Sequence, residues 1–412
     1  MSSMLEKEQV YKELLRCNKC GGCQVICPTY KATYYEGNVA RGRLFLVRKY
    51  LESGEQALLK TPEIIQSLEQ CLLCESCTKV CPSGVRTAEV VLYYRQQLLE
   101  VKGAKNKWKE RLYRLAFLNK AFIPLAAKLA YYYQKFGVIP DPYQLRSFLS
   151  QYLDGQVLRD NPGTGITLPA TGQRKYKVTF FVGCASNTFY HRAALAAINL
   201  LRRWADVTLL DNYCCGAPLL SLGAVDGFRE VASRNLELIS REQTDFIVTD
   251  CSTCASVLKQ YPARLGVAVP VMTKLRDLVE ILIQEREHLS PVKGSGRQKF
   301  TFHYPCHLAR GQNLKEPTQK LLDGLFGSSY QPHLEDDSCC GGAGTFGILH
   351  RDLAQKITAA KLANIQNSGA AQVVTSCPAC LMQLGAVVKR LALPLVVKPL
   401  AVFLEEAMGE SR

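Results

Sequence analysis

The residues best suited to metal chemistry in this chain are its eighteen cysteines, which fall into four groups with none left over. Two groups have the spacing C-x2-C-x2-C-x3-C-P, which is typical of ferredoxins that bind [4Fe–4S] clusters. The first run contains Cys17, Cys20, Cys23 and Cys27, followed by Pro28, and the second contains Cys71, Cys74, Cys77 and Cys81, followed by Pro82. One such run also fits a zinc knuckle, but two with matched spacing favour iron–sulfur clusters and electron transfer.

The other ten cysteines form two copies of a five-cysteine pattern, separated by a nearly constant number of residues. Each copy has a single cysteine, an adjacent pair and a C-x2-C motif. The first copy contains Cys184, Cys214, Cys215, Cys251 and Cys254, and the second contains Cys306, Cys339, Cys340, Cys377 and Cys380. Adjacent cysteines rarely both point into one tetrahedral zinc site. The pairs therefore favour a larger or opened cluster over structural zinc.

The two ferredoxin-type runs are expected to share their ligands. In two-cluster ferredoxins the fourth cysteine of each run binds the other cluster. Applied to this chain, Cys17, Cys20, Cys23 and Cys81 bind one [4Fe–4S] cubane, and Cys71, Cys74, Cys77 and Cys27 bind the second. Such interlocked ligation holds two clusters close enough for electron transfer, so this part of the chain is predicted to conduct electrons and not to catalyse.

The elements around the first two runs are predicted to be helical. Arg43–Leu51 has an apolar face, and Ala88–Val101 has a helical pattern after the second run. Thr61 followed by Pro62 marks a helix start, because Thr is a common N-cap and Pro is favoured at the first helical position.

Each outer cysteine motif of the two repeats follows a predicted strand and precedes a predicted helix. The strands are Val178–Val182, Phe246–Thr249, Phe300–His303 and Val373–Thr375, and the helices are His191–Trp204, Ser252–Tyr261, Glu316–Leu322 and Pro378–Leu391. Alternating strands and helices favour a parallel sheet, whose ligand crevice lies at the carboxyl ends of its strands. Each repeat is therefore predicted to bring its five thiolates to one crevice.

The whole chain is thus predicted to be multidomain, of mixed α+β and α/β class, as its 412 residues also suggest. We expect a helical two-cluster ferredoxin domain at 1–102 and a basic helical connector and linker at 103–172. Two repeated α/β cysteine-rich domains follow at 173–292 and 297–412.

Two further features of the repeats are expected to act on a bound cluster. Gly216, and Gly341 with Gly342, follow the cysteine pairs and would let the backbone approach inorganic sulfide. His303 and His307 flank Cys306, and we expect them to hydrogen-bond a cluster sulfur, with ligation or proton transfer as the alternatives.

The formal net charge of +15 counts the cysteines as neutral thiols. If all eighteen bind clusters as thiolates, their negative charges cancel this excess, and the positive cores of four clusters return the net charge to a small positive value. The net charge is therefore a poor argument for nucleic-acid binding. Residues 101–135 carry nine basic residues against one acid, with apolar residues between them. This pattern fits a solvated helix face, or a surface for an acidic partner or an anionic membrane. No stretch approaches the ~20 apolar residues of a membrane-spanning helix.

Together, the two ferredoxin runs, the segments Gly37–Arg43 and Cys81–Arg86, and the five-cysteine repeats resemble the iron–sulfur subunit of glycolate oxidase over essentially the whole chain. The repeats are similar to the CCG domains of heterodisulfide reductase, where each full repeat holds a noncubane [4Fe–4S] cluster. The resemblance therefore implies one or two further noncubane-type clusters besides the two cubanes. Many glycolate oxidase subunits lack one cysteine of the last pair, whereas this chain keeps all ten.

The resemblance implies an electron-transfer subunit of a 2-hydroxy-acid oxidase or dehydrogenase complex acting on glycolate or D-lactate. A separate FAD-binding subunit would oxidise the substrate, and this chain would pass electrons to a quinone, an electron-transfer protein or a disulfide. Because the chain has no flavin or nicotinamide motif that we can defend, it is not expected to oxidise a hydroxy acid alone. We expect a cytoplasmic protein, with peripheral contact at the inner face of the membrane as an alternative.

Two other functions remain open on the sequence. One is a heterodisulfide-reductase-like catalytic subunit that reduces a disulfide at noncubane clusters, which the ten intact cysteines favour. The other is a zinc protein that binds nucleic acid through the basic connector; the matched ferredoxin runs argue against it, and no nucleic-acid partner is expected.

Overall fold

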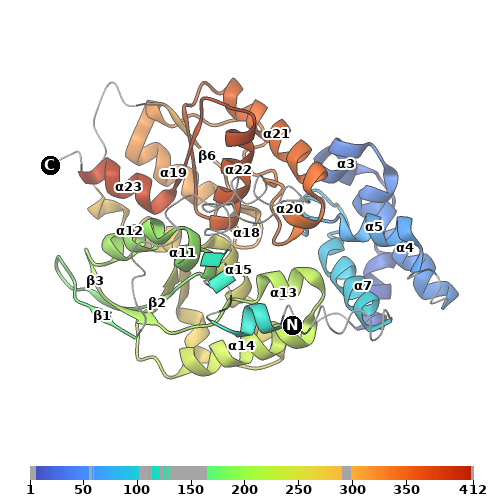
Figure 1. The fold of residues 1–412 in the computed structure, drawn as a ribbon, viewed down its shortest axis with the longest axis horizontal. Helices are drawn as coiled ribbons and strands as arrows, with labels where there is room; N and C mark the ends of the chain where they lie inside the picture. The colour runs from blue at the N-terminus through green and yellow to red at the C-terminus, as the bar shows by residue number, and fades with distance from the viewer. Residues whose placement is uncertain are drawn as a thin grey trace.

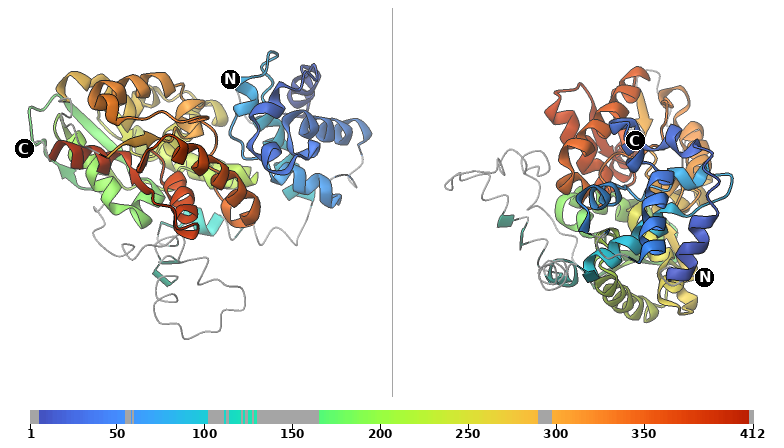
Figure 2. Two further views of the ribbon diagram at one scale, coloured as in Figure 1. Left: turned by 90° about the horizontal axis from the view of Figure 1, so that it is seen from above. Right: turned by 90° about the vertical axis from the view of Figure 1, so that its right-hand side faces the viewer.

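The protein is described from a computed structural model. The structure describes residues 6–54, 58, 60–101, 111, 114–120, 122, 125–126, 128–129, 165–289 and 298–409. In Figure 1 the N-terminal helices, in blue, lie at one end of the molecule, and the two cysteine-rich repeats lie against each other beside them. Figure 2 shows the same arrangement from two further directions.

The N-terminal part is helical, as predicted, with no strand among the described residues 6–101. Its helices are α1 (Lys7–Leu15), α2 (Gly22–Ile26), α3 (Pro28–Thr33), α4 (Ala40–Ser53), α5 (Pro62–Glu69), α6 (Ser76–Lys79) and α7 (Thr87–Val101). Helix α5 begins at Pro62, as its sequence indicates, because proline has a helical φ and no N–H to leave unpaired. Val10, Val47 and Val91 form a buried core between α1, α4 and α7. This core supports the cysteine runs in the adjoining loops and short helices.

The first repeat contains a five-stranded sheet of order β1-β3-β2-β4-β5, in which only β1 is antiparallel to its neighbour. Its strands are β1 (Thr167–Leu168), β2 (Tyr176–Phe181), β3 (Ala205–Leu210), β4 (Phe246–Thr249) and β5 (Leu275–Asp277). Its helices are α11 (Cys184–Phe189), α12 (His191–Leu201), α13 (Ala217–Leu222), α14 (Val225–Ser240), α15 (Ser252–Lys259), α16 (Tyr261–Leu265) and α17 (Leu278–Gln284). Phe180 and Phe181 belong to different hydrophobic clusters, so both faces of the sheet are covered.

The end of the predicted linker contributes a strand to this sheet. Thr167 and Leu168 form β1, which pairs with Thr208 and Val207 at the free edge of β3. The Gly/Pro/Thr composition around 161–172 suggests a loop, but an extended pair of residues can add to any exposed strand edge whose hydrogen-bonding groups are unpaired.

The second repeat has a smaller parallel sheet of order β6-β7-β8. Its strands are β6 (Phe300–Phe302), β7 (Gln372–Thr375) and β8 (Val396–Pro399), and its helices are α18 (Cys306–Ala309), α19 (Lys315–Phe326), α20 (Phe346–Leu349), α21 (Arg351–Asn367), α22 (Pro378–Arg390) and α23 (Leu400–Gly409). An isolated bridge between Phe300 and Tyr330 stands beside β6 where the first repeat has β3. The four strands predicted before the outer cysteine motifs are therefore present in parallel sheets.

The two repeats share their hydrophobic cores. One cluster contains residues of α12 and α17 from the first repeat and of α19 and α23 from the second. The other contains residues of α14 and α15 together with residues of α21 and α22. The N-terminal part contacts both repeats, since α7 lies against α13 and α3 lies against α21. The repeats are thus held in one fixed arrangement by shared apolar burial.

Part of the basic connector packs against the first repeat. Arg114 forms an ion pair with Glu230, and Lys120 forms one of 2.8 Å with Asp211. Phe117 packs against the second hydrophobic cluster. These cations are paired within the chain, while most of the basic residues at 101–135 lie outside the described residues. No helix among the described residues is long and apolar enough to span a membrane.

Candidate iron–sulfur centres

The loops of the two ferredoxin-type runs have the same backbone conformation at matching positions. Lys19 and Leu73, at matching positions, have φ of 60° and 53°, and Gly21 and Glu75 have φ of 81° and 58°. Left-handed φ in a residue other than glycine costs roughly 1–2 kcal/mol, so it persists only where the surroundings require it. The short helices α2 and α6 begin directly after these turns. Because both runs have this strained turn at the same position, both loops are expected to surround the same kind of metal cluster.

The cysteines assigned to the second cluster lie together. Cys27, Cys71, Cys74 and Cys77 line one small cavity, and Cys81 does not. Burial, followed by the influence of the neighbouring thiols, raises the pKa of Cys77. Burial also raises the pKa of Cys74 to about 11. Four soft sulfur donors around one buried space are the donor set that a [4Fe–4S] cubane takes.

The cysteines assigned to the first cluster lie nearer the surface. Cys20 is the one exposed cysteine of the eighteen, all of which the structure describes. Cys17 and Cys81 pack against the same N-terminal core, and α2 lies against α6. Burial, opposed by backbone hydrogen bonding and reinforced by Cys27 and Cys17, raises the pKa of Cys23.

Two buried arginines contact the second cysteine group from within the N-terminal part. Arg43 is 2% exposed, donates from Nε to the Ser67 carbonyl at 2.8 Å, and has Nη1 4.0 Å from Cys27 Sγ. Arg95 is 8% exposed and donates from Nη2 to the Cys71 carbonyl at 2.6 Å. A buried cation is costly unless an anion lies nearby, and thiolates bound to a cluster supply that charge.

A third arginine reaches the same group from the second repeat. Arg310 donates from Nε to the Cys74 carbonyl at 2.6 Å and from Nη1 to the Asp337 carbonyl at 2.8 Å. Burial acts to lower the pKa of Arg310. Its net pKa is nevertheless raised, because negative charge on Cys74, Cys306 and Asp337 lies nearby. The guanidinium therefore lies between a ferredoxin-type cysteine group and the cysteines of the second repeat.

In both repeats, cysteines occupy the starts of helices at the carboxyl ends of strands. Cys251 is the N-cap of α15 and Cys377 is the N-cap of α22. Cys251 Sγ accepts a hydrogen bond of 3.4 Å from the backbone N–H of Cys254. Free N–H groups and the helix dipole favour a thiolate at this position.

The C-x2-C motifs of the two repeats meet face to face. The N–H of Ser252 donates to the carbonyl of Ser376 at 3.0 Å, and their hydroxyl oxygens are 2.7 Å apart. Thr253 Oγ1 lies 3.2 Å from Cys377 Sγ and 3.2 Å from Nδ1 of His307. Hydrogen bonds from the Cys251 and Cys380 thiols hold the pKa of Cys377 well below its ordinary value.

As a result, both repeats open into one cavity of about 840 Å³. Nine of the ten repeat cysteines line it, all except Cys214, and so does Cys71 of the second ferredoxin-type run. The sequence predicted one crevice for each repeat; the structure instead brings the two sets of thiols and the edge of the ferredoxin-type part to a shared cavity.

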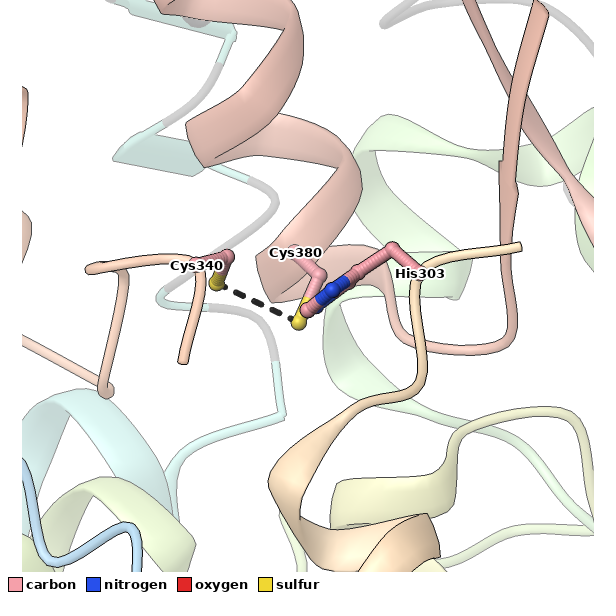
Figure 3. Close-up of side chains that lie close together, drawn as sticks. All are labelled: His303, Cys340 and Cys380. Carbon is pink, nitrogen blue, oxygen red and sulfur yellow. Dashed lines mark hydrogen bonds between the residues drawn. The ribbon is translucent and has the colours of Figure 1, made fainter. Parts of the chain in front are cut away.

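Backbone N–H groups after the fused pairs donate to a different cysteine in each repeat. The N–H of Gly216 donates to Sγ of Cys214, the first cysteine of its pair, and the N–H of Gly342 donates to Sγ of Cys340, the second cysteine of its pair, both at 3.4 Å. In the second repeat, Cys340 Sγ lies 3.3 Å from Cys380 Sγ (Figure 3). Hydrogen bonding with the Cys339 and Cys380 thiols lowers the pKa of Cys340 to about 5.

The two histidines beside Cys306 have different surroundings. His307 has Nδ1 3.8 Å from Cys306 Sγ, and although burial lowers it, this contact raises the pKa of His307 to about 9. His303 is fully buried and lines the shared cavity. Burial holds the pKa of His303 well below its ordinary value, so the imidazole is neutral. The sequence predicts that both histidines hydrogen-bond a cluster sulfur; His307 lies beside the Cys306 sulfur, and the hydrogen bonds to a cluster stay predictions.

The donor chemistry of these sites fits iron–sulfur clusters. All eighteen cysteines are free thiols, and seventeen of them are buried or half-buried. The buried Lys361 adds a positive charge near the second pair and donates to the carbonyl oxygens of Glu335 and Asp336 at 3.0 and 3.1 Å. Soft anionic ligands with buried cations around them suit clusters whose net charge is negative.

Family comparisons agree with this composition of sites. Residues 13–85 match the family described as "4Fe-4S dicluster domain", and residues 178–259 and 300–385 each match the family described as "Cysteine-rich domain". The chain is therefore an iron–sulfur protein that joins a dicluster domain to two cysteine-rich domains.

Within this class, the chain is similar over nearly its whole length to glycolate oxidase iron–sulfur subunits. It is 27% identical to the "Probable glycolate oxidase iron-sulfur subunit" of Bacillus subtilis, over 96% of this chain and 94% of the relative. It is 28% identical to the "Glycolate oxidase iron-sulfur subunit" of Escherichia coli, over 89% and 88%. It is also 26% identical to one of the subunits of the dihydromethanophenazine:CoB–CoM heterodisulfide reductase of Methanosarcina acetivorans, over 97% and 95%. The resemblance inferred from the motifs is confirmed.

Proposed function

We propose that this chain is the electron-transfer subunit of an oxidoreductase complex that oxidises a 2-hydroxy acid, glycolate or D-lactate. One observation carries the proposal. The cysteine groups form a continuous series, from the exposed Cys20, through the buried group around Cys77, to the cavity shared by the two repeats. Such a series suits electron transfer through the protein, and the names of the glycolate oxidase relatives suggest the substrate class.

The ligand sets of this proposal follow the crossed pattern. Cys17, Cys20, Cys23 and Cys81 bind one cubane, Cys71, Cys74, Cys77 and Cys27 bind the other, and each repeat holds a further cluster on its five cysteines. The common cavity of Cys27 and Cys71–Cys77 supports the second set. In an anaerobic EPR experiment, Cys27→Ser should damage the cluster of the second run and leave the first. Loss of the first-run cluster alone would contradict the crossed assignment.

We infer the direction of electron transfer from the solvent exposure of the cysteine groups. An electron donor reaches the first-run cluster most easily, because Cys20 is exposed. The second-run cluster is next to the repeats, since Cys71 lines the shared cavity and the Cys74 carbonyl accepts from Arg310. Electrons therefore enter at the first run and leave from the repeats, toward a quinone, an electron-transfer protein or a disulfide.

The electron donor is an FAD-binding partner subunit. The test is to mix the anaerobic, oxidised chain with that subunit and add glycolate or D-lactate. The proposal predicts loss of the cluster absorption near ~400 nm only when chain, partner and substrate are all present. Bleaching by substrate without the partner, or a colourless chain loaded with zinc, would contradict it. We place the complex in the cytoplasm, with peripheral membrane contact through the basic connector as the alternative location.

A second function is favoured by one feature of the cavity. Nine of the ten repeat cysteines line a single space of about 840 Å³, which leaves room for a substrate beside the clusters. A heterodisulfide-reductase-like subunit would reduce a disulfide there. Adding the CoM–CoB heterodisulfide to the chemically reduced chain separates the two functions. Rapid reoxidation with release of thiols would favour this second function, and no reaction would favour electron transfer alone.

A further inference from the structure

The two repeats differ at one position that faces the cysteines. The third residue before the first cysteine of each repeat ends the leading strand or follows it directly. This residue is Phe181 in the first repeat and His303 in the second. Both side chains are fully buried. Equivalent positions in an internal repeat therefore carry an apolar ring in one case and a ring with two nitrogen atoms in the other.

The His303 ring lies with two sulfurs of the second repeat. A ring nitrogen of His303 and the sulfurs of Cys340 and Cys380 all lie within 4.8 Å of one another. Figure 3 shows the ring directed at Cys380, with Cys340 on the other side of that sulfur. Ligands of one tetrahedral metal, with bonds of roughly 2.0–2.3 Å, lie on the order of 3.5–3.8 Å apart. The three atoms are thus within a small adjustment of sharing one metal atom.

The first repeat has the two sulfurs but not the third donor. Cys215 and Cys254 are the counterparts of Cys340 and Cys380, and their thiols also interact. Phe181 supplies no lone pair at the third corner. Among the described residues, the His303, Cys340 and Cys380 group is the one set of three donors close enough to hold a metal ion.

The nitrogens of His303 are otherwise unsatisfied. Neither Nδ1 nor Nε2 has a hydrogen-bond partner among the described residues, although the side chain is fully buried. A buried polar group left without a partner costs about 1–3 kcal/mol, so such groups are rare unless they serve a ligand. By contrast, His307 already contacts Cys306 and Thr253. Of the two histidines beside Cys306, His303 is the one whose two ring nitrogens are both without a partner among the described residues.

We propose that His303 is a ligand of an iron atom in the second repeat, together with Cys340 and Cys380. The cluster of the second repeat then has mixed cysteine and histidine ligation, whereas the cluster of the first repeat has cysteine ligation alone. The inference rests on the proposed presence of clusters in the repeats. An iron atom bound by neutral imidazole has a higher potential than one bound by a thiolate in the same position, so a His303 ligand favours the second repeat as the site where electrons collect.

The direct test is pulsed EPR of the anaerobic, reduced protein labelled with ¹⁵N-histidine. A directly bound imidazole predicts a strong histidine nitrogen coupling on the second-repeat cluster. His303→Phe, which reproduces the first repeat, should remove that coupling, whereas His307→Asn should keep it. His303→Cys supplies an anionic ligand in place of the neutral one, so it should retain the iron but shift the reduction potential of this cluster to a lower value.

Several results would overturn the proposal, and they separate it from the proposed function. A weak coupling in the wild-type protein would mean that His303 hydrogen-bonds a sulfur and does not bind iron. An unchanged spectrum in His303→Phe, with the iron of the repeats retained, would have the same meaning. Iron sufficient only for the two ferredoxin-type cubanes would instead refute clusters in the repeats, and with them both proposals. The wild-type measurement decides the matter even if His303→Phe folds poorly.

Discussion

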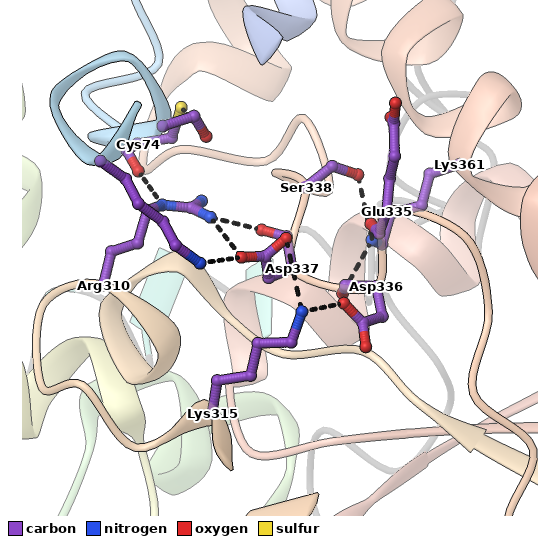
Figure 4. A network of polar contacts seen from close by, with 10 residues as sticks. Cys74, Arg310, Lys315, Glu335, Asp336, Asp337, Ser338 and Lys361 are labelled. Atoms are coloured by element: carbon purple, nitrogen blue, oxygen red, sulfur yellow. Dashed lines mark hydrogen bonds and ion pairs between the residues drawn. The ribbon is translucent and has the colours of Figure 1, made fainter. Parts of the chain in front are cut away.

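Arg310 links the ferredoxin-type part to the second repeat. Besides the Cys74 and Asp337 carbonyls, its guanidinium reaches the Asp337 carboxylate at 3.3 Å. Lys79 approaches the same carboxylate at 3.2 Å. Lys315 approaches it at 3.9 Å, as Figure 4 shows. Burial acts to raise the pKa of Asp337, but Arg310 and the two lysines hold this pKa below its ordinary value. The network keeps one positive charge fixed between two cysteine groups.

Removing this charge should change the second-run cluster. Arg310→Gln is expected to lower its reduction potential by tens of millivolts, since about 59 mV corresponds to a tenfold change for a one-electron couple. The physical reason is that a nearby cation favours the reduced, more negative cluster. Anaerobic redox titration followed by EPR measures the potential. Lys320→Gln, at an exposed position of α19, is the control and should change nothing. Equal potentials in both variants and wild type would contradict this role.

For single residues, the sequence indicates the candidate metal ligands more readily than the residues around them. Cysteine spacing identifies all eighteen thiols as candidate ligands because they stand in motifs that recur along the chain with the same spacing. Arg43, Arg95 and Arg310 have no such signal. They contact Cys27, Cys71 and Cys74 across long stretches of chain, so only the folded structure shows that they surround the second run.

Among the elements, the turn after each cysteine pair depends on glycine. Gly216 and Gly341 have φ of 80° and 89°. A Cβ added at Gly341 would lie 2.8 Å from the carbonyl oxygen of Ala354 in α21. Both the backbone angle and the close approach therefore exclude a larger residue beside Cys340.

Gly341→Ala is predicted to destabilise the protein by about 1–3 kcal/mol and to perturb the second-repeat cluster. Gly324→Ala is the matched control, because nothing lies within 4 Å of its added Cβ and alanine is favoured in a helix such as α19. Anaerobic urea unfolding and EPR measure the two effects. Similar behaviour of the two variants would show that the turn after the cysteine pair is not constrained.

Helix α1 is attached to the second run by a buried carboxylate. Glu13 accepts hydrogen bonds of 3.0 Å from the backbone N–H and Nε of Arg86 and pairs with Arg16 at 3.1 Å. Although burial raises it, these contacts hold the pKa of Glu13 below its ordinary value of 4.5. Such a group stabilises the fold above pH 4.5, and the contribution is lost as the pH falls through the folded-state pKa.

Glu13→Gln should therefore cost about 1.5–3 kcal/mol at pH 7, and the difference from wild type should shrink as the pH falls below 4.5. Urea unfolding of the anaerobic protein, followed by circular dichroism at several pH values, provides the measurement. Glu8→Gln on the same helix is the control and should have little effect, because its pair with Lys12 is exposed. A difference between wild type and Glu13→Gln that is constant down to pH 4 would contradict the assignment.

The elements that lead into cysteine motifs were predictable, and the others less so. β4 spans Phe246–Thr249 as predicted, because a β-branched run that stops before a cysteine is a strong local signal. β1 and β8 are short edge strands whose pairing depends on a neighbouring strand. The predicted helix Ser252–Tyr261 ends at Lys259, and α16 begins at Tyr261 with Pro262, since proline favours a new first turn.

At the scale of the whole molecule, the sequence does not predict how the two repeats pack against each other. The constant spacing of the cysteines predicts two similar units, but nothing in it says that α23 packs on α12 or that Ser252 bonds to Ser376. These contacts turn two crevices into one cavity and place it against the second ferredoxin-type run. The proposed path for electrons depends on this assembly.

The most direct test of the whole account is iron and sulfide counting, with Mössbauer spectra, on anaerobically purified protein before and after Cys339→Ala. We predict about sixteen irons per chain, with some in sites unlike ordinary cubanes, and loss or alteration of those sites in the variant. About eight irons, all in ordinary cubanes and unaffected by Cys339→Ala, would contradict the account, because the repeats would then hold no cluster.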